Sequence, residues 1–274
     1  MNYPFSRILL ATEHSEFDAG AERLAFAMAK RCNVPLRVVV PLLSNPEYEA
    51  EMPEMALRVE QEAGGKIAEL RKQAESFGIQ LDVHVRRGRD IHTEIVNEAR
   101  ESETDLIVIR RRGKPSFLAR MLVGEMVSKV IRDSTCSVLL VPRAAEFWSK
   151  RILASVGDTP GASNISRTAG MIASVCDVPL TVLTVASEAD SKSVTNARNS
   201  NKSNVELASA ISGKVTGEIR EGKPVEQIIA AAKETAADLV VIGRQRYHLV
   251  PFGHQSIMQS IAGNMDVPTL VVAI

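Results

Sequence analysis

The stretch Ile8-Leu9-Leu10-Ala11-Thr12 decides the fold, because a similar run returns 144 positions later as Ile152-Leu153-Ala154-Ser155-Val156. The same offset aligns Cys32-Asn33-Val34-Pro35-Leu36 with Cys176-Asp177-Val178-Pro179-Leu180. The repeated cysteines are predicted to be apolar helix positions, since a free cysteine behaves as a small hydrophobic residue. The chain therefore contains an internal repeat, and each half is interpreted as one copy of the repeated unit.

The repeat continues to the end of the 274 residues with a shrinking offset. Asp105-Leu106-Ile107-Val108-Ile109 matches Asp238-Leu239-Val240-Val241-Ile242 at an offset of 133, and Val138-Leu139-Leu140-Val141 matches Thr269-Leu270-Val271-Val272 at 131. Because the order of the matches is kept, the second half is a copy of the first half with two short deletions.

Apolar runs alternate with amphipathic stretches in each half. Strands are predicted at residues 7–11, 36–40, 81–86, 105–109 and 137–141, and again at 151–156, 180–185, 214–220, 238–242 and 268–273. Helices are predicted at 18–32, 53–77, 90–101 and 124–132. Nearly continuous Val, Ile and Leu runs are typical of parallel strands covered by helices on both faces. Each half is therefore expected to be a doubly wound, Rossmann-like α/β sandwich.

The two predicted domains comprise residues 1–145 and 150–274. The link follows Val141-Pro142, where proline cannot donate to a strand ladder and ends the strand. Because the link is short, the halves are expected to pack as one rigid body. Residues 187–204 are rich in Ser and Asn, and we expect a mobile loop that leads into a helix, with a regulatory segment as the alternative.

Composition excludes several classes of protein. The 33 basic residues equal the 33 acidic ones, which argues against a nucleic-acid binder. No apolar run approaches the roughly 20 residues that cross a bilayer, and the first residues do not resemble an export signal. Three cysteines without a Cys-x-x-Cys spacing predict neither a disulfide framework nor a zinc site. A cytoplasmic protein that does not contact membranes is expected.

Ligands of open parallel sheets bind beyond the carboxyl ends of the strands, where the strand order reverses. In the first half this crevice lies between Thr12-Glu13-His14-Ser15-Glu16 and Arg110-Arg111-Arg112-Gly113-Lys114, and the second loop leads towards Gly124. Glycine lets backbone amides approach a phosphate, and a helix N-terminus favours an anion. A phosphate site and a solvated turn both remain open as interpretations.

At these residues the chain resembles the universal stress protein family in its tandem two-domain form. The resemblance is strongest at residues 8–16, at Glu221-Gly222-Lys223-Pro224, at residues 238–243 and at the closing strands. It implies a flavodoxin-like sandwich with the sheet order 3-2-1-4-5. It also implies that two such units associate through their last strands, here about a pseudo-twofold axis within one chain.

Nucleotide-binding members of that family carry Gly-x-x-Gly, nine further residues and Gly-Ser/Thr, with an Asp after the first strand. The first half keeps Gly113 and Gly124, but Arg110 replaces the first glycine, Glu125 the hydroxyl residue and Glu13 the Asp. The resemblance implies a degenerate nucleotide site at Ala11, Thr12, Glu13, Val40, Arg110, Arg112, Gly113, Lys114, Gly124, Glu125 and Met126.

The second half departs from the pattern differently. It keeps Gly243 and Ser256, but Arg246 and Gln255 replace the later glycines and Gly157 takes the Asp position; another register makes Gly253 the last glycine. We therefore expect ATP or a related adenine nucleotide to bind weakly at best in the first half and not in the second.

Charged residues in the first-half site affect the binding of an anionic ligand in opposite ways. Glu125 at a helix N-terminus repels a triphosphate, whereas Arg110, Arg111, Arg112 and Lys114 attract an anion. The alternative is a solvated basic turn that pairs with Glu13 or Glu125. No histidine has the spacing of a metal-binding helix, so no metal is expected.

The expected function is a non-enzymatic, ligand-binding or partner-binding module of the stress response. The alternatives are slow ATP hydrolysis in the first-half crevice, with Glu13 as the base, and an ATP-dependent or other small-ligand sensor. A nucleotide or anion and a protein are the candidate partners, and further homodimerisation stays open.

The acidic run Glu47, Glu49, Glu51 and Glu54 is predicted to be a solvated loop and helix start. Core filling or interface contacts are expected of Met52, Met55, Met121, Met126, Met258 and Met265.

Overall fold

Strands and helices alternate along the computed structural model, which describes residues 3–111, 124–158, 161–187, 191–244 and 257–274. The strands are β1 (Ile8–Ala11), β2 (Leu36–Leu43), β3 (Leu81–Gly88), β4 (Leu106–Arg110), β5 (Ser137–Val141), β6 (Ile152–Ser155), β7 (Leu180–Ala186), β8 (Val215–Glu221), β9 (Leu239–Gly243) and β10 (Thr269–Val272). The helices are α1 (Ala19–Cys32), α2 (Pro46–Glu51), α3 (Pro53–Ser76), α4 (Ile91–Glu101), α5 (Glu125–Asp133), α6 (Ala162–Cys176), α7 (Ser191–Ser209), α8 (Pro224–Glu234) and α9 (Ile257–Asn264).

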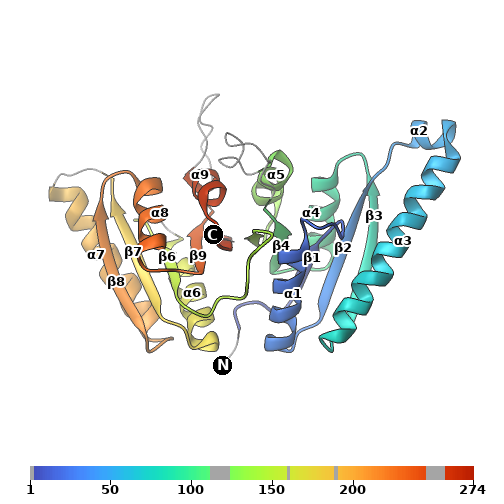
Figure 1. The fold of residues 1–274 in the computed structure, drawn as a ribbon. Coiled ribbons are helices and arrows are strands. Elements are labelled where there is room, and N and C mark those ends of the chain that lie inside the picture. The colour runs from blue at the N-terminus through green and yellow to red at the C-terminus, as the bar shows by residue number, and fades with distance from the viewer. Residues whose placement is uncertain (1–2, 112–123, 159–160, 188–190, 245–256) are drawn as a thin grey trace.

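The described strands form one ten-stranded sheet in the order β3-β2-β1-β4-β5-β10-β9-β6-β7-β8. Each half has the expected order 3-2-1-4-5, and its strands are parallel. The halves join through antiparallel pairing of β5 with β10, in which Leu139 faces Leu270. Figure 1 shows the two halves side by side about this junction. The predicted fold class is confirmed, and so is the association through the last strands.

Two apolar layers cover the sheet and run through both halves. Alternating strand residues such as Leu10 and Ile152 pack on one face with α1, α3, α6 and α7. Their neighbours, such as Leu9 and Leu153, pack on the other face with α4, α5, α8 and α9. Because both faces of the inner strands are buried, these strands need largely apolar sequences, whereas the edge strands β3 and β8 carry charged residues and are partly exposed. This requirement explains why the predicted strand bounds agree with the observed ones to within three residues at each end.

The helix that we expect a loop to lead into within residues 187–204 is α7, and it begins earlier than predicted, at Ser191. Its Ser- and Asn-rich sequence has low helix propensity, but tertiary contacts override that preference. The amide of Asn201 is buried and donates to the carbonyl oxygens of Val182 and Glu218, at 2.9 and 3.1 Å. Ala208 packs into the apolar layer on the same side. The part of the acidic run expected to be a loop also differs, since residues 46–51 form the short helix α2.

The repeated cysteines end α1 and α6, as expected of helix positions, and both side chains are half-buried. The indole Nε1 of Trp148 donates to the Sγ atom of Cys176 at 3.3 Å. Burial raises the pKa of Cys32 from 9.0 to about 11, because the charged thiolate is poorly solvated there.

This pKa predicts slow alkylation of Cys32 in the folded protein. At pH 8 its thiolate fraction is lower by about a hundred-fold than that of a thiol at 9.0, since two pKa units separate them. Iodoacetamide should therefore label Cys32 about a hundred-fold more slowly in buffer than in urea, and labelling should accelerate as the pH approaches 11. Mass spectrometry of timed samples reports each thiol. Equal rates with and without urea would contradict the assignment.

Candidate functional site

The N-terminal crevice lies between the carboxyl ends of β1 and β4, and the guanidinium of Arg110 occupies it. This side chain is 4% exposed and donates through Nη1 to the Asp18 carboxylate and to Ser15 Oγ, both at 2.8 Å. Its Nη2 lies 3.0 Å from Glu13 Oε1. Since Asp18 is as buried as Arg110, the two charges compensate each other away from water.

A second set of contacts turns the chain after β1 towards α1. Thr12 Oγ1 donates to Glu22 Oε1 at 2.6 Å and accepts the backbone N–H of His14 at 2.8 Å. His14 adopts a left-handed backbone (φ 47°), and its Nδ1 lies 3.0 Å from the same Glu22 oxygen. The polar groups that follow β1 are thus bonded within the protein.

The remaining cavity in this crevice has a volume of about 10 Å³. Ala11, Thr12, Glu13, Arg110 and Met126 line it, so the structure brings five of the predicted positions together. This volume is about that of one water probe, and a nucleotide enters only if Arg110 moves.

The other predicted positions of this half lie elsewhere. Val40 is buried in β2, pairs with Val85 of β3 and does not line the cavity. Gly124 precedes α5, and the carboxylate of Glu125 is exposed and pairs with Lys129 at 3.0 Å. Arg112, Gly113 and Lys114 lie outside the described residues.

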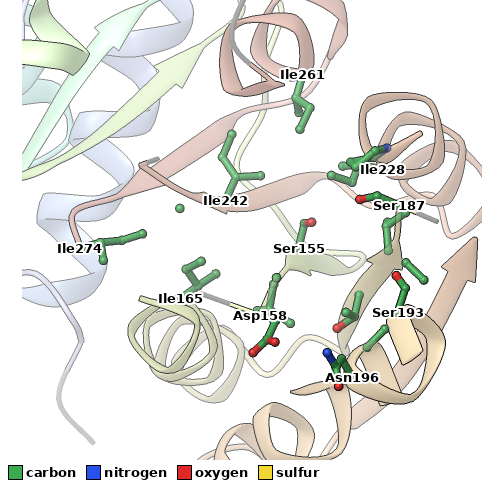
Figure 2. A pocket seen from close by; sticks show the side chains of 18 residues that line it. Ser155, Asp158, Ile165, Ser187, Ser193, Asn196, Ile228, Ile242, Ile261 and Ile274 are labelled. Carbon is green, nitrogen blue, oxygen red and sulfur yellow. The ribbon is translucent and has the colours of Figure 1, made fainter. Parts of the chain in front are cut away.

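The C-terminal crevice, at the ends of β6 and β9, contains a cavity of about 350 Å³. Figure 2 shows isoleucines from four elements and the chain end around it, together with polar side chains from β6, α7 and the segments that follow β6 and β7. The labelled isoleucines are Ile165, Ile228, Ile242, Ile261 and Ile274. The labelled polar residues are Ser155, Asp158, Ser187, Ser193 and Asn196. Gly243 also lines the cavity, whereas Ser256 lies outside the described residues.

The difference between the crevices follows from two repeat positions. Gly243 ends β9 where Arg110 ends β4, and Gly157 follows β6 where Glu13 follows β1. The second half therefore lacks both members of the ion pair that fills the first. A Cβ atom at Gly243 would come within 2.7 Å of Ile165 Cδ1, so a larger residue there would displace the end of the Ile165 side chain. The cavity sizes are the reverse of what the motifs led us to expect, and nucleotide binding in either half stays a prediction.

Arginines next to the two crevices join the halves. Arg111, which follows β4, donates through Nη1 to the carbonyl oxygens of Ala262 and Gly263 at 3.0 Å, and also to that of Met265. Burial lowers the pKa of the Arg111 guanidinium. Arg244, which follows β9, donates to the carbonyl oxygens of Ser134 and Cys136.

Each of these arginines thus bonds the region where the last helix of the other half ends, and Figure 1 shows α5 and α9 on either side of the junction. We expected Arg111 to attract an anion. The signal that could have revealed its role is that Arg111 and Arg244 occupy the same repeat position.

Within the described ranges, no three His, Cys, Asp or Glu side chains lie close enough together to hold a metal ion. In the same residues, no helix is long and apolar enough to cross a membrane.

Comparisons with known proteins cover both halves. A model described as the universal stress protein family matches residues 4–142 and 149–273. The chain is 25% identical over 143 residues to universal stress protein MJ0531 of Methanocaldococcus jannaschii, covering 51% of this chain and 83% of the relative. It is 29% identical over 148 residues to universal stress protein YxiE of Bacillus subtilis, covering 50% and 99%.

Solved structures share the whole architecture. A universal stress protein from Archaeoglobus fulgidus superposes with a TM-score of 0.73 at 21% identity and covers 98% of this chain and 97% of its own. A structure from Pseudomonas aeruginosa, described as a putative universal stress protein, gives a TM-score of 0.71 at 18% identity, with 98% and 93% covered. At these identities the likeness shows the fold.

Proposed function

The chain belongs to the universal stress protein family, and from this premise we propose that it is a non-enzymatic binding module of the stress response. We propose further that its small-molecule site is the C-terminal crevice. The observation that carries the proposal is the cavity of about 350 Å³ at the point where the strand order reverses. Cavities of about 300–1,000 Å³ at such points are the usual binding sites of small molecules in α/β proteins.

The lining indicates the class of ligand. Ile165, Ile228 and Ile242 offer apolar surface to a flat ring, while Ser155 and Asn196 offer hydrogen bonds to hydroxyl groups. An adenine nucleoside or nucleotide combines such a ring with such hydroxyls. Among the described lining residues, the charged side chain is that of Asp158, an anion that repels phosphates. We therefore expect adenosine and AMP to bind more tightly than ATP.

Nucleotide binding in the N-terminal crevice is proposed to be weak at most. A ligand there would have to displace Arg110, which leaves the buried carboxylate of Asp18 without its cation. Removing one partner of a buried pair is strongly unfavourable. Slow ATP hydrolysis with Glu13 as the base has no support from the geometry, because that carboxylate pairs with Arg110 beside a cavity of about 10 Å³.

Filling the C-terminal cavity should abolish ligand binding. Ser155 points into the cavity, and the variant Ser155→Phe places an aromatic ring where the ligand would lie. In calorimetric titrations with adenosine, AMP and ATP, we expect the variant to lose at least about ten-fold in affinity relative to the wild type. The matched control Ser209→Phe, at the exposed end of α7 and away from the cavity lining, should bind like the wild type.

Two outcomes would overturn the proposed site and its ligand class. Binding of none of the three compounds would exclude an adenine ligand, and undiminished binding by Ser155→Phe would move the site out of this crevice. The ATP samples are also assayed for released phosphate, and release above that of buffer alone would contradict the non-enzymatic assignment. Unchanged circular dichroism of both variants ensures that folding is not the cause.

A further inference from the structure

A groove at the outer end of the N-terminal half exposes apolar side chains. It lies between the end of β2 and the start of α3 and has a volume of about 360 Å³. Met52, Met55 and Val59 line it from α3 and its N-cap, at the spacing that places side chains on one face of a helix. Leu43 at the end of β2 contributes a side chain that is 68% exposed. Methionines at such a surface adapt to partners of different shape.

The fold itself does not require this surface. The first buried residue of α3 is Ala63, so residues 53–62 extend beyond the part of the helix that covers the sheet. Figure 1 shows α2 and the start of α3 at the far edge of the molecule, away from the junction of the halves. In the other half, α7 covers the equivalent strands with 19 residues, against 24 in α3. The extension is therefore not shared by the two repeated units.

One carboxylate lines the groove and others lie close to it along the chain, and three of them have no cation within salt-bridge distance among the residues that the structure describes. Arg87 also lines the groove, but its charge is paired with Glu60, and Arg58 pairs with Glu62. No residue that the structure describes forms an ion pair with Glu49, which lines the groove. The same holds for the nearby Glu51 and Glu54. The groove thus combines an apolar floor with an uncompensated negative rim.

From this combination we propose that the groove binds an amphipathic helix of a partner protein, with the helix presenting apolar anchors flanked by Lys and Arg. Helices bind apolar grooves through side chains at i, i+3, i+4 and i+7, and opposite charges at the rim select the partner.

The same charges argue against two other occupants. A second copy of this chain would place like charges opposite each other across a symmetric interface. An anionic lipid surface would be repelled by the rim.

The test uses the full chain and a fluorescent peptide of leucine and lysine, with leucines on one helical face. Anisotropy titrations should show saturable binding. The double variant Met52→Ser, Met55→Ser should weaken binding by at least about ten-fold, because these exposed anchors form the groove. Leu57→Ser is the matched control: Leu57 is 55% exposed on the same helix but does not line the groove, so its affinity should be unchanged.

Charge is tested separately. The triple variant Glu49→Gln, Glu51→Gln, Glu54→Gln should bind the peptide more weakly and with less dependence on salt. A peptide with glutamate in place of lysine should not bind. Absence of saturable binding to the basic peptide, or equal affinity of the double methionine variant, would overturn the proposal. So would sedimentation showing a dimer of the chain that the methionine substitutions dissociate.

Discussion

Replacing Arg110 with alanine is expected to lower the free energy of unfolding by about 3–5 kcal/mol, which is the usual cost of removing one partner from a buried ion pair. The variant leaves the carboxylate of Asp18, with a side chain 1% exposed, without its cation at 2.8 Å. It also removes the partner of Glu13. Urea denaturation followed by circular dichroism measures the loss.

The chain contains a matched control for this prediction. Arg143 and Glu16 also lie 2.8 Å apart, but their side chains are 58% and 61% exposed. Arg143→Ala should change the free energy of unfolding by at most about 1 kcal/mol, because water screens exposed pairs. Adding Asp18→Asn to Arg110→Ala should recover part of the loss, since it removes the unpaired charge. Equal effects of Arg110→Ala and Arg143→Ala would show that burial does not determine the contribution of the pair.

Replacing Arg111 with alanine is expected to lower the free energy of unfolding by about 2–4 kcal/mol. The guanidinium donates to three carbonyl oxygens near the end of α9. A hydrogen bond from a charged donor contributes about 1.5–3 kcal/mol, and each buried acceptor left unpaired costs about 1–3 kcal/mol. Urea denaturation measures this change as well, and limited proteolysis of the link at residues 144–150 should become faster as the halves separate more often.

Arg132→Ala serves as the control for Arg111→Ala. Arg132 lies in the last turn of helix α5, is 61% exposed and pairs with the adjacent Asp133. Its removal should cost at most about 1 kcal/mol. If both variants have the same stability, the contacts between Arg111 and the other half contribute nothing that a surface arginine does not.

The sequence predicted the fold well because the information lies in local runs. A strand buried on both faces must be apolar throughout, so Asp105-Leu106-Ile107-Val108-Ile109 and its repeat identify β4 and β9 without any knowledge of their neighbours. The early start of helix α7 was missed for the opposite reason. Its stability depends on the contact of Asn201 with the carbonyl oxygens of two strands, and no local pattern of Ser and Asn reveals such a contact.

The position of the candidate site could be predicted from the sequence, but whether each crevice is filled or open could not. The strand order placed both crevices, and the repeat aligned Arg110 with Gly243. Whether Arg110 faces solvent or fills its crevice depends on Asp18, which is 92 residues away along the chain. The glycines of a phosphate-binding motif carry no information about such a partner. The larger cavity therefore lies in the half that we had expected not to bind.

The antiparallel pairing of β5 with β10 occurs within one polypeptide, so dilution cannot separate the two sandwiches. If the two halves were separate subunits, those with a filled crevice and those with an open crevice would associate in all combinations. Covalent tethering instead fixes the ratio at one to one in every molecule. Each half can then accumulate its own substitutions, because one sequence does not have to occupy both positions about the axis, as it does in a homodimer.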